Sequence, residues 1–381
     1  MTSKRSLLAS LIHFFLRWLA ITCGFFRNNS ILYLKLDAIG DYVIWTGCAK
    51  CLCRHYNRHG FTNILICQPS IAPLACETKI FDQIIELDIE KYCKHISYRL
   101  AWLLKIHVCN PTILLNSVIS RVPIMEQITR SIHAKKRIAI KDALCNISAN
   151  EAQEYEMYYS QILNAPGDNK HELDYYSYML DQLNIKHSTN ELHPKLPIPD
   201  INDKLELPEK YVAIVPGSSL ARKNWPVTHF AEVALTINLP IVILGSSDDK
   251  DVCNRLEVLI RQHSEKVINT AGIISLSEFV RFITNSDLVI SNDTAAVHIS
   301  IAANRPCICI LGGWHFGHFA PYPDYIQHKA TFIFERMDCF NCNWQCKYVK
   351  DSEQLVPCVK KINTFAVKKA IIGHIGPALC I

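Results

Sequence analysis

Along most of the chain, short runs of apolar and β-branched residues alternate with amphipathic stretches of helix length. The run ILYLKL at 31–36 precedes an amphipathic stretch at 42–57, and similar runs recur up to KRIAI at 136–140. A second series begins with YVAIV at 211–215 and ends with PCICILG at 306–312. Strands that alternate with helices in this way form βαβ units on parallel sheets. The pattern predicts an α/β fold with two doubly wound, Rossmann-like domains that face a central cleft.

A polar stretch separates the two series. Residues 186–210 are rich in Pro, Asn, Asp and Lys and lack a sustained hydrophobic period, which is typical of a linker. The length of 381 residues is enough for two domains of ordinary size. The predicted organisation is a helix at 1–30, an N-terminal Rossmann-like domain at 31–190, a linker at 191–210, a C-terminal Rossmann-like domain at 211–363 and a helical tail at 364–381.

The first residues form a long apolar segment with one polar stripe. The polar side chains recur at intervals of three and four residues, and they are Ser3, Ser6, Ser10, His13 and Arg17. A membrane-spanning helix would place Arg17 near the bilayer centre at a cost of about 3 kcal/mol, whereas a helix in the headgroup plane keeps the stripe in water. We therefore predict an amphipathic helix on a membrane surface. A helix packed on the protein's own body stays open, and a signal peptide is disfavoured because no A-x-A cleavage site follows.

Composition and charge narrow the class of protein. With 49% hydrophobic and 20% charged residues, the chain is typical of a globular protein. The net charge is +5, but residues 1–30 hold four basic side chains and no acidic one, which leaves 36 basic against 35 acidic residues elsewhere. A nucleic-acid-binding domain would spread positive charge over its folded body, so we expect a membrane surface and no nucleic acid as partner. The 17 cysteines are scattered and odd in number, which favours a reducing compartment over a secreted disulfide framework.

Candidate binding residues lie in the turns that follow predicted strands, where open parallel sheets bind their ligands. After the first strand, Gly40 allows a close backbone approach, and Asp41 falls at a helix start, where a carboxylate caps free amides or faces the cleft. After the strand YVAIV, Ser218 and Ser219 offer hydroxyls and backbone amides to phosphate oxygens, and Lys223 adds a positive charge. This turn has neither the spacing of a P-loop nor a G-x-G-x-x-G fingerprint.

A third turn follows the strand DLVISN. Asp293, Thr294 and Ala295 open a helix there, and its positive end, its free amides and the threonine hydroxyl suit a diphosphate. His298 lies four residues after Thr294 and on the same helix face. A hydrogen-bonded core histidine explains His298 equally well.

Two further candidate sites lie in the turn after PIVILG and in the C-terminal tail. Asp248 and Asp249 are placed to accept hydrogen bonds from ribose hydroxyls, or they simply occupy the first turn of a helix. Four cysteines have a spacing that suits a tetrahedral structural zinc ion, and they are Cys339, Cys342, Cys346 and Cys358. A reduced structural loop is the alternative.

In this order, the turns resemble those of glycosyltransferase family 9, the ADP-heptose:lipopolysaccharide heptosyltransferases. The matching stretches are ILYLKLDAIGD (31–41), VAIVPGSSLARKNWP (212–226), VILGSSDD (242–249), the stretch from INTAG to CILGG (268–313) and the cysteine-bearing tail after 338. The resemblance runs from 31 to about 363 and leaves out the N-terminal segment. It implies the two-domain GT-B fold and an inverting transfer that needs no metal.

The resemblance also implies roles for individual residues. Asp41 matches the acid of the family's I-G-D motif, the general base that removes the proton of the acceptor hydroxyl. Lys223 matches the lysine that contacts the donor's diphosphate, Thr294 the threonine that binds phosphate, and His298 the histidine that lines the same pocket. The paired acids of VILGSSDD fall where the family binds the nucleoside ribose.

Two positions depart from the family's pattern. Ala295 stands where glycine is usual, and its methyl group narrows the access of phosphate to the backbone. Lys35 stands where arginine is common, which keeps the positive charge without the bidentate fork. Similar cysteines recur in many family members outside the chemistry.

We therefore expect an inverting glycosyltransferase that moves a sugar, heptose from ADP-heptose, to a lipid-linked acceptor such as the lipopolysaccharide inner core. It requires no cofactor for catalysis, uses the nucleotide sugar as co-substrate, and acts as a peripheral protein at the cytoplasmic face of the bacterial inner membrane. Tethering there raises the effective concentration of enzyme at an embedded acceptor. Two alternatives stay open. One is transfer from UDP-hexose or UDP-N-acetylhexosamine to a different surface glycan, and the other is a non-catalytic nucleotide-sugar-binding protein, which Ala295 would suit.

Overall fold

A computed structural model of the chain describes residues 29–141, 146–167, 170–200, 205–350 and 354–380. By their contacts, these residues divide into two compact units. The first unit holds the described parts of 29–37, 48–167 and 174–187, and the second holds those of 38–47, 170–173 and 188–380. The beginning of the first long helix therefore groups with the second unit.

The predicted N-terminal amphipathic helix at 1–30 lies outside the described residues, apart from its last two positions. Ser30 already belongs to the first strand. Within the described ranges, we find no helix with both the length and the apolar character needed to cross a membrane.

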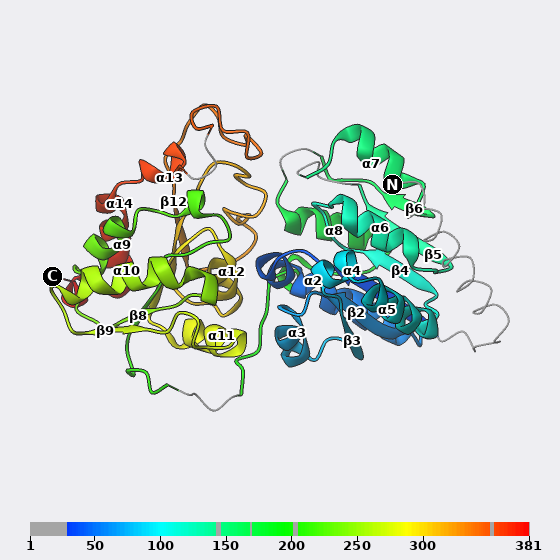
Figure 1. The fold of residues 1–381 in the computed structure, drawn as a ribbon, viewed down its shortest axis with the longest axis horizontal. Coiled ribbons are helices and arrows are strands. Elements are labelled where there is room, and N and C mark those ends of the chain that lie inside the picture. The colour runs from blue at the N-terminus through cyan, green and yellow to red at the C-terminus, as the bar shows by residue number, and fades with distance from the viewer. Residues whose placement is uncertain (1–28, 142–145, 168–169, 201–204, 351–353, 381) are drawn as a thin grey trace. The chain divides into compact units, whose positions relative to one another are not determined.

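The first unit contains a six-stranded sheet in which all neighbouring strands are parallel. The order β3-β2-β1-β4-β5-β6 places β1 beside β4, at the point where the strand order reverses (Figure 1). Doubly wound sheets bind ligands at such a reversal. The elements are β1 (Ser30–Lys35), α2 (Ile39–Arg58), β2 (Thr62–Cys67), α3 (Ala72–Thr78), β3 (Gln83–Glu86), α4 (Ile89–Lys94), α5 (Ile96–Cys109), β4 (Ile113–Asn116), α6 (Pro123–Ser131), β5 (Lys136–Ile140), α7 (Ala149–Glu156), β6 (Gln161–Leu163) and α8 (Glu172–Gln182).

The second unit repeats this architecture. Its parallel strands have the order β12-β11-β10-β7-β8-β9, so β7 and β10 are the neighbours at the reversal. The strands are β7 (Val212–Val215), β8 (Ile241–Ile243), β9 (Val267–Asn269), β10 (Leu288–Asn292), β11 (Cys307–Ile310) and β12 (Ala330–Ile333). The helices are α9 (Val227–Ala234), α10 (Lys250–Arg261), α11 (Leu276–Asn285), α12 (Ala295–Ala302), α13 (Pro357–Lys360) and α14 (Thr364–Ile375).

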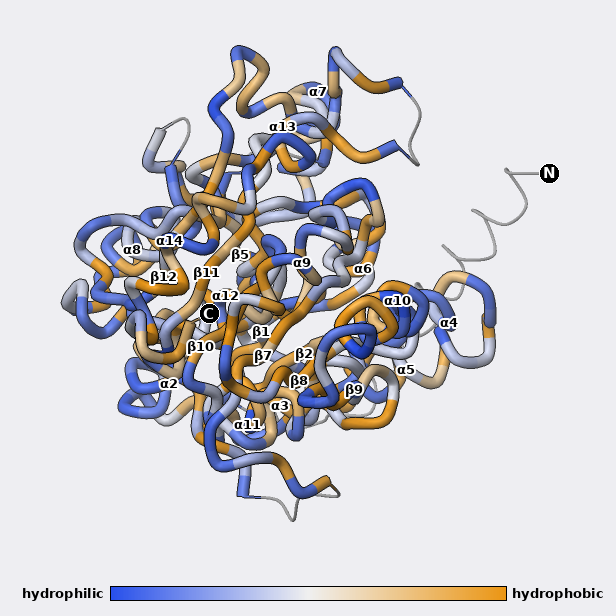
Figure 2. Tube along the Cα trace, turned by 90° about the vertical axis from the view of Figure 1, so that its left-hand side faces the viewer, coloured by the Kyte–Doolittle hydropathy of each residue, from blue (hydrophilic) through white to orange (hydrophobic). Residues whose placement is uncertain are grey.

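Both faces of the second sheet are buried. Strand residues such as Ile214, Ile243 and Ile290 belong to one continuous core with apolar side chains of α9, α10 and α14. Val289 and Cys307, which point to the opposite face, are also fully buried. Figure 2 accordingly shows the strands among the most hydrophobic segments of the chain. Helices on both faces explain why these strands appear in the sequence as unbroken apolar runs.

The predicted elements are largely confirmed. The run KRIAI is β5, and a capping box of Ser275 and Glu278 begins α11. The hydrophobic pattern misses the edge strands β6 and β12, in which Leu163 is the one buried residue. The expected α/β fold with two parallel doubly wound sheets is confirmed.

Candidate active site

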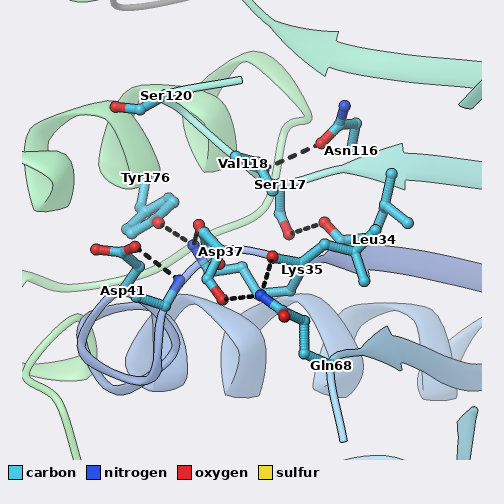
Figure 3. Close-up of polar contacts among 12 residues, drawn as sticks. Leu34, Lys35, Asp37, Asp41, Gln68, Asn116, Ser117, Val118, Ser120 and Tyr176 are labelled. Atoms are coloured by element: carbon cyan, nitrogen blue, oxygen red, sulfur yellow. Dashed lines mark hydrogen bonds and ion pairs between the residues drawn. The ribbon is translucent and has the colours of Figure 1, made fainter. Parts of the chain in front are cut away.

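In the first unit, a buried ion pair fixes the turn after β1. Lys35 is fully buried, and its Nζ donates to Asp37 Oδ2 at 2.6 Å and to the Tyr176 hydroxyl at 2.8 Å (Figure 3). Gln68 Nε2 donates to the backbone carbonyl oxygens of Leu36 and Asp37 at 2.6 and 3.1 Å. Lys35 therefore holds this turn, because its one ammonium group bonds to both Asp37 and Tyr176.

Asp41 lies in the first turn of α2, as predicted. One of its carboxylate oxygens accepts a hydrogen bond from the Ala38 N–H at 3.0 Å, so a capping role is confirmed. By its contacts this end of α2 belongs to the second unit, and the charge of Asp41 interacts there with those of Lys223 and Asp293. This carboxylate therefore has electrostatic interactions in addition to its capping hydrogen bond.

Gly40 permits the close approach that the sequence predicts. A Cβ atom at this position would lie 2.9 Å from His298 Cδ2 and 3.5 Å from the Cα atom of Ala295. Side chains do not normally pack as closely as the first of these distances. The absence of a side chain at Gly40 thus brings the start of α2 against α12.

Lys223 follows β7 on a short 3-10 helix (Ala221–Lys223). Burial lowers the pKa of its amine, while the negative charges of Asp293 and Asp41 oppose that shift and favour the ammonium form. The lysine thus lies among carboxylates at the strand-order reversal of the second sheet, where a ligand is expected. This is the position that the sequence assigns to the contact with a diphosphate.

A buried asparagine ties the Lys223 turn to the neighbouring strand. Asn292, the last residue of β10, accepts a hydrogen bond from the Trp225 N–H at 2.9 Å and donates to the Pro216 carbonyl oxygen at 2.7 Å. The Ser218 hydroxyl hydrogen-bonds within the same turn at 2.6 and 2.8 Å, whereas Ser219 is exposed. Sequence reasoning did not single out Asn292. The available signal is the pair of polar residues, Ser291 and Asn292, that ends a strand whose other residues are apolar.

The third predicted turn opens a helix, as expected. Thr294 is the N-cap of α12, and its hydroxyl accepts a hydrogen bond from the Ala296 N–H at 3.3 Å. The Ser291 and Thr294 hydroxyl oxygens lie 3.0 Å apart. Ala295 is the first residue of the helix, so its methyl group stands at the end where the backbone amides gather.

Asp293 lies between the Lys223 turn and the segment after β11. Burial raises the pKa of its carboxyl group, and the charges of Lys223 and His315, together with a hydrogen bond from the Trp314 side chain, lower it. The carboxyl group therefore connects the lysine with an aromatic segment that sequence reasoning did not assign to the site.

His298 is hydrogen-bonded and buried in the second unit. Its Nδ1 lies 3.0 Å from the Tyr322 hydroxyl, and burial, assisted by the positive charge of Lys223, lowers its pKa to about 4. The imidazole is therefore neutral near pH 7. This outcome fits a satisfied core histidine, while the contact of its ring with Gly40 keeps it beside the start of α2.

Asp249 lies between two turns of the second sheet. Its Oδ2 accepts hydrogen bonds from the N–H and the hydroxyl of Ser246, at 2.9 and 2.6 Å. Its Oδ1 packs against Gly217, where a Cβ atom would approach within 2.0 Å. The interpretation as a first-turn acid is confirmed for Asp249. Asp248 is exposed in the same turn, and a ribose contact by either acid stays a prediction.

Comparison with known sequences identifies the family. Residues 153–348, which are 196 of the 381 residues, match the sequence model of glycosyltransferase family 9 (heptosyltransferase). The chain belongs to this family. The matched range includes Lys223, Thr294 and His298 but not Asp41.

A curated relative of this family 9 protein is lipooligosaccharide heptosyltransferase 2 of Haemophilus influenzae. The two are 32% identical over 127 residues, which cover 32% of this chain and 36% of the relative. The aligned stretches cover 36% of the length of this first curated relative and 52% of the length of a second one, between about a third and a half of those proteins.

Solved structures share the fold of this family 9 protein. A family 9 glycosyltransferase from Veillonella parvula has a TM-score of 0.71 at 17% identity, covering 91% of this chain and 96% of that one. The ADP-heptose lipopolysaccharide heptosyltransferase II of Escherichia coli has a TM-score of 0.64 at 16% identity, covering 90% and 98%. Both likenesses extend over nearly the whole of each chain.

The four C-terminal cysteines of this family 9 protein surround one small cavity. They are free thiols, and they line a space of about 10 Å³ together with Arg222, Trp314 and Trp344. The Gly313 N–H donates to Cys358 Sγ at 3.5 Å. Among the described residues, no group of three or more His, Cys, Asp or Glu side chains is arranged to hold a metal ion. The zinc site at these cysteines stays a prediction, which metal analysis of the purified protein tests.

Buried neutral histidines make the stability of this family 9 protein sensitive to acid. Burial lowers the pKa of His171 to about 3 and that of His318 to about 4, beside His298. Between pH 6.5 and 5 the unfolded chain takes up protons that these imidazoles do not, so the free energy of unfolding falls as the pH falls. Each such histidine lowers it by about 2 kcal/mol at pH 5.

Urea unfolding at pH 7.5, 6 and 5 measures this dependence. His171→Asn is expected to reduce the fall in the free energy of unfolding between pH 7.5 and 5 by the contribution of one such histidine, about 2 kcal/mol. His263→Asn changes an exposed histidine and should leave this fall unaltered. An equal fall in wild type and His171→Asn would contradict the prediction.

Proposed function

We propose that this chain is an inverting glycosyltransferase that moves heptose from ADP-heptose to a lipid-linked acceptor such as the lipopolysaccharide inner core. The observation that carries the proposal is the meeting of Lys223, Asp293 and the N-terminus of α12 at the strand-order reversal of the second sheet. A heptosyltransferase among the curated relatives, and a similar fold in a protein named for ADP-heptose, support this donor.

The donor's diphosphate binds where positive charge gathers. The Lys223 ammonium contacts its oxygens, and the N-terminal end of α12 adds backbone amides and the positive end of the helix dipole. His298 is itself a residue of α12, and because its imidazole is neutral it adds no charge. The ribose is held by Asp249 or the neighbouring Asp248, beside the turn that contains Ser218 and Ser219.

The chemistry is a single displacement. Asp41 removes the proton of the acceptor hydroxyl, and that oxygen attacks the anomeric carbon from the face opposite the diphosphate. The bond from the anomeric carbon to the diphosphate oxygen breaks, and its electron pair leaves as negative charge on the departing nucleoside diphosphate. Attack from the opposite face inverts the anomeric centre. Lys223 and the α12 N-terminus stabilise the charge on the leaving group, a role that then needs no metal ion.

We also propose that the protein works at the cytoplasmic face of the bacterial inner membrane. The apolar N-terminal segment with its polar stripe and four basic residues supports attachment to an anionic surface. A lipid-linked acceptor lies in that surface, which makes attachment useful.

A thermal-shift panel tests the donor directly. ADP, GDP, UDP, CDP and their common sugar conjugates are compared, because a ligand at about 100 times its dissociation constant adds about 2.7 kcal/mol of stability. We expect selective stabilisation by ADP and ADP-heptose. Stabilisation by UDP compounds instead would overturn the choice of sugar donor, and no response to any nucleotide at saturation would overturn the transferase proposal.

A further inference from the structure

Two tryptophans form a pair beneath Lys223. The Lys223 Nζ lies 4.6 Å from the centroid of the Trp344 ring and 5.2 Å from that of the Trp314 ring. The two rings are stacked, with their centroids 4.7 Å apart and their planes 17° from parallel. A cation within about 6 Å of an indole face is attracted by the negative face of the ring. The tryptophan pair, Trp314 and Trp344, therefore attracts this ammonium group.

No ion pair holds Lys223 within 4.0 Å, as far as the described residues go. The carboxylates of Asp293 and Asp41 act on its charge without such a contact. A carboxylate in contact with Lys223 would accept hydrogen bonds from its N–H groups and compete for them with a phosphate. A ring face attracts the ammonium group but is not a strong hydrogen-bond acceptor. The ammonium group can thus be held in place while its N–H groups remain available to an anionic ligand.

The fold fixes both members of the tryptophan pair. Trp314 is buried, its ring lies on the backbone of Gly312, and its side chain hydrogen-bonds Asp293. The backbone carbonyl oxygen of Trp344 accepts a hydrogen bond from Arg222 Nη2 at 3.1 Å, and the Arg222 guanidinium lies 5.1 Å from the Trp344 ring centroid. The cysteine-lined cavity lies against both rings. Contacts within the protein therefore fix the orientation of both indole rings in the absence of a ligand.

We propose that Trp344, stacked on Trp314, is a positioning residue that holds the Lys223 ammonium for the diphosphate of the nucleotide donor. The inference rests on the proposed function, since it takes Lys223 as the contact of that diphosphate. A lysine side chain has many rotamers, and contact of its ammonium group with two ring faces reduces the number of rotamers that it populates before the donor binds. Trp344 acts through Lys223 and does not itself touch the reacting atoms.

A double-mutant cycle on ADP affinity tests the proposal. Isothermal titration with ADP is carried out on wild type, Trp344→Phe, Trp344→Leu, Lys223→Met and the double variant of Leu at 344 with Met at 223. We expect Trp344→Leu to weaken ADP binding by about 3- to 30-fold, the range that a cation–π contact spans, and Trp344→Phe to weaken it less, because phenylalanine keeps a ring face. In the Lys223→Met background the Trp344→Leu change should have almost no further effect, since no ammonium remains to be positioned.

Tyr348→Leu is the matched control. Tyr348 is an aromatic residue of the same segment, and it is half-exposed and hydrogen-bonded to Asp338. Its replacement should leave ADP affinity unchanged. A thermal melt of each variant identifies loss of fold, and if Trp344→Leu does not fold, the same cycle is read with Trp344→Phe.

Each outcome of this experiment has a clear meaning. Equal weakening of ADP binding by the 344 change with and without the Lys223 ammonium would show a structural effect and overturn the proposal. Unchanged affinity in folded Trp344→Leu would overturn it as well. Failure of wild type to bind ADP or any other nucleoside diphosphate would overturn the proposed function, whereas ADP binding without coupling between the two residues overturns only the role of Trp344.

Discussion

Replacement of Asp41 by Asn is expected to lower turnover by about 10²- to 10⁴-fold, the contribution that a general base makes, while ADP binding is almost unchanged. An amide does not accept the proton of the acceptor hydroxyl. Its oxygen still accepts a hydrogen bond, so the contact with the Ala38 N–H and the start of α2 are preserved. Initial rates with ADP-heptose and acceptor, together with calorimetric titration of ADP, measure both quantities.

Asp88→Asn provides the matched control for this change. Asp88 caps α4 in the first unit by accepting a hydrogen bond from the Lys91 N–H at 2.9 Å. The same exchange of carboxylate for amide at that helix start should leave turnover unaltered. Equal turnover of Asp41→Asn and wild type would rule out Asp41 as the base, and loss of ADP binding in that variant would indicate a structural role instead.

Replacement of Lys223 by Met is expected to impair both binding and chemistry. Removing one group that stabilises the developing negative charge costs about 10²- to 10³-fold in rate. Loss of a charge-assisted contact with the diphosphate also weakens ADP by roughly 10-fold or more. Methionine keeps much of the length of the side chain, so packing against the tryptophan pair is largely retained. Single-turnover rates at saturating donor separate the two effects.

Lys368→Met is the control for the loss of a lysine. Lys368 lies on α14 and pairs with Glu232 at 2.7 Å, with both side chains partly exposed. Exposed pairs of this kind contribute about 1 kcal/mol or less to stability, so the variant should resemble wild type in rate and ADP affinity. If Lys223→Met bound ADP as tightly as wild type, the diphosphate contact would have to be assigned to another residue.

The strands and the turns that follow them are predictable from the sequence for a physical reason. A strand buried on both faces is apolar at most positions, so a change to polar residues marks the region of its end. Asp41, Lys223 and Thr294 all stand shortly after such ends, and the structure has each of them near a helix start or turn at a strand-order reversal.

Other parts of the candidate site leave no local trace in the sequence. Asn292 bonds to Trp225 across 67 positions, and Arg222 reaches Trp344 across 122. Neither contact belongs to a helical or strand period, and the segments after β11 have little regular structure in which a period could appear. The tryptophans therefore read as ordinary apolar residues until the fold brings them under Lys223.

The grouping of residues 38–47 with the second unit has a consequence for protein engineering. Exchange of the first unit between family members would test what that unit recognises, and the obvious junction is the polar stretch near residue 190. A chimera cut only there would replace the start of α2 along with the rest of the first unit, and would separate Gly40 from the His298 ring against which it packs. Grafts that keep 38–47 and 170–173 from the parent of the second unit preserve those native contacts.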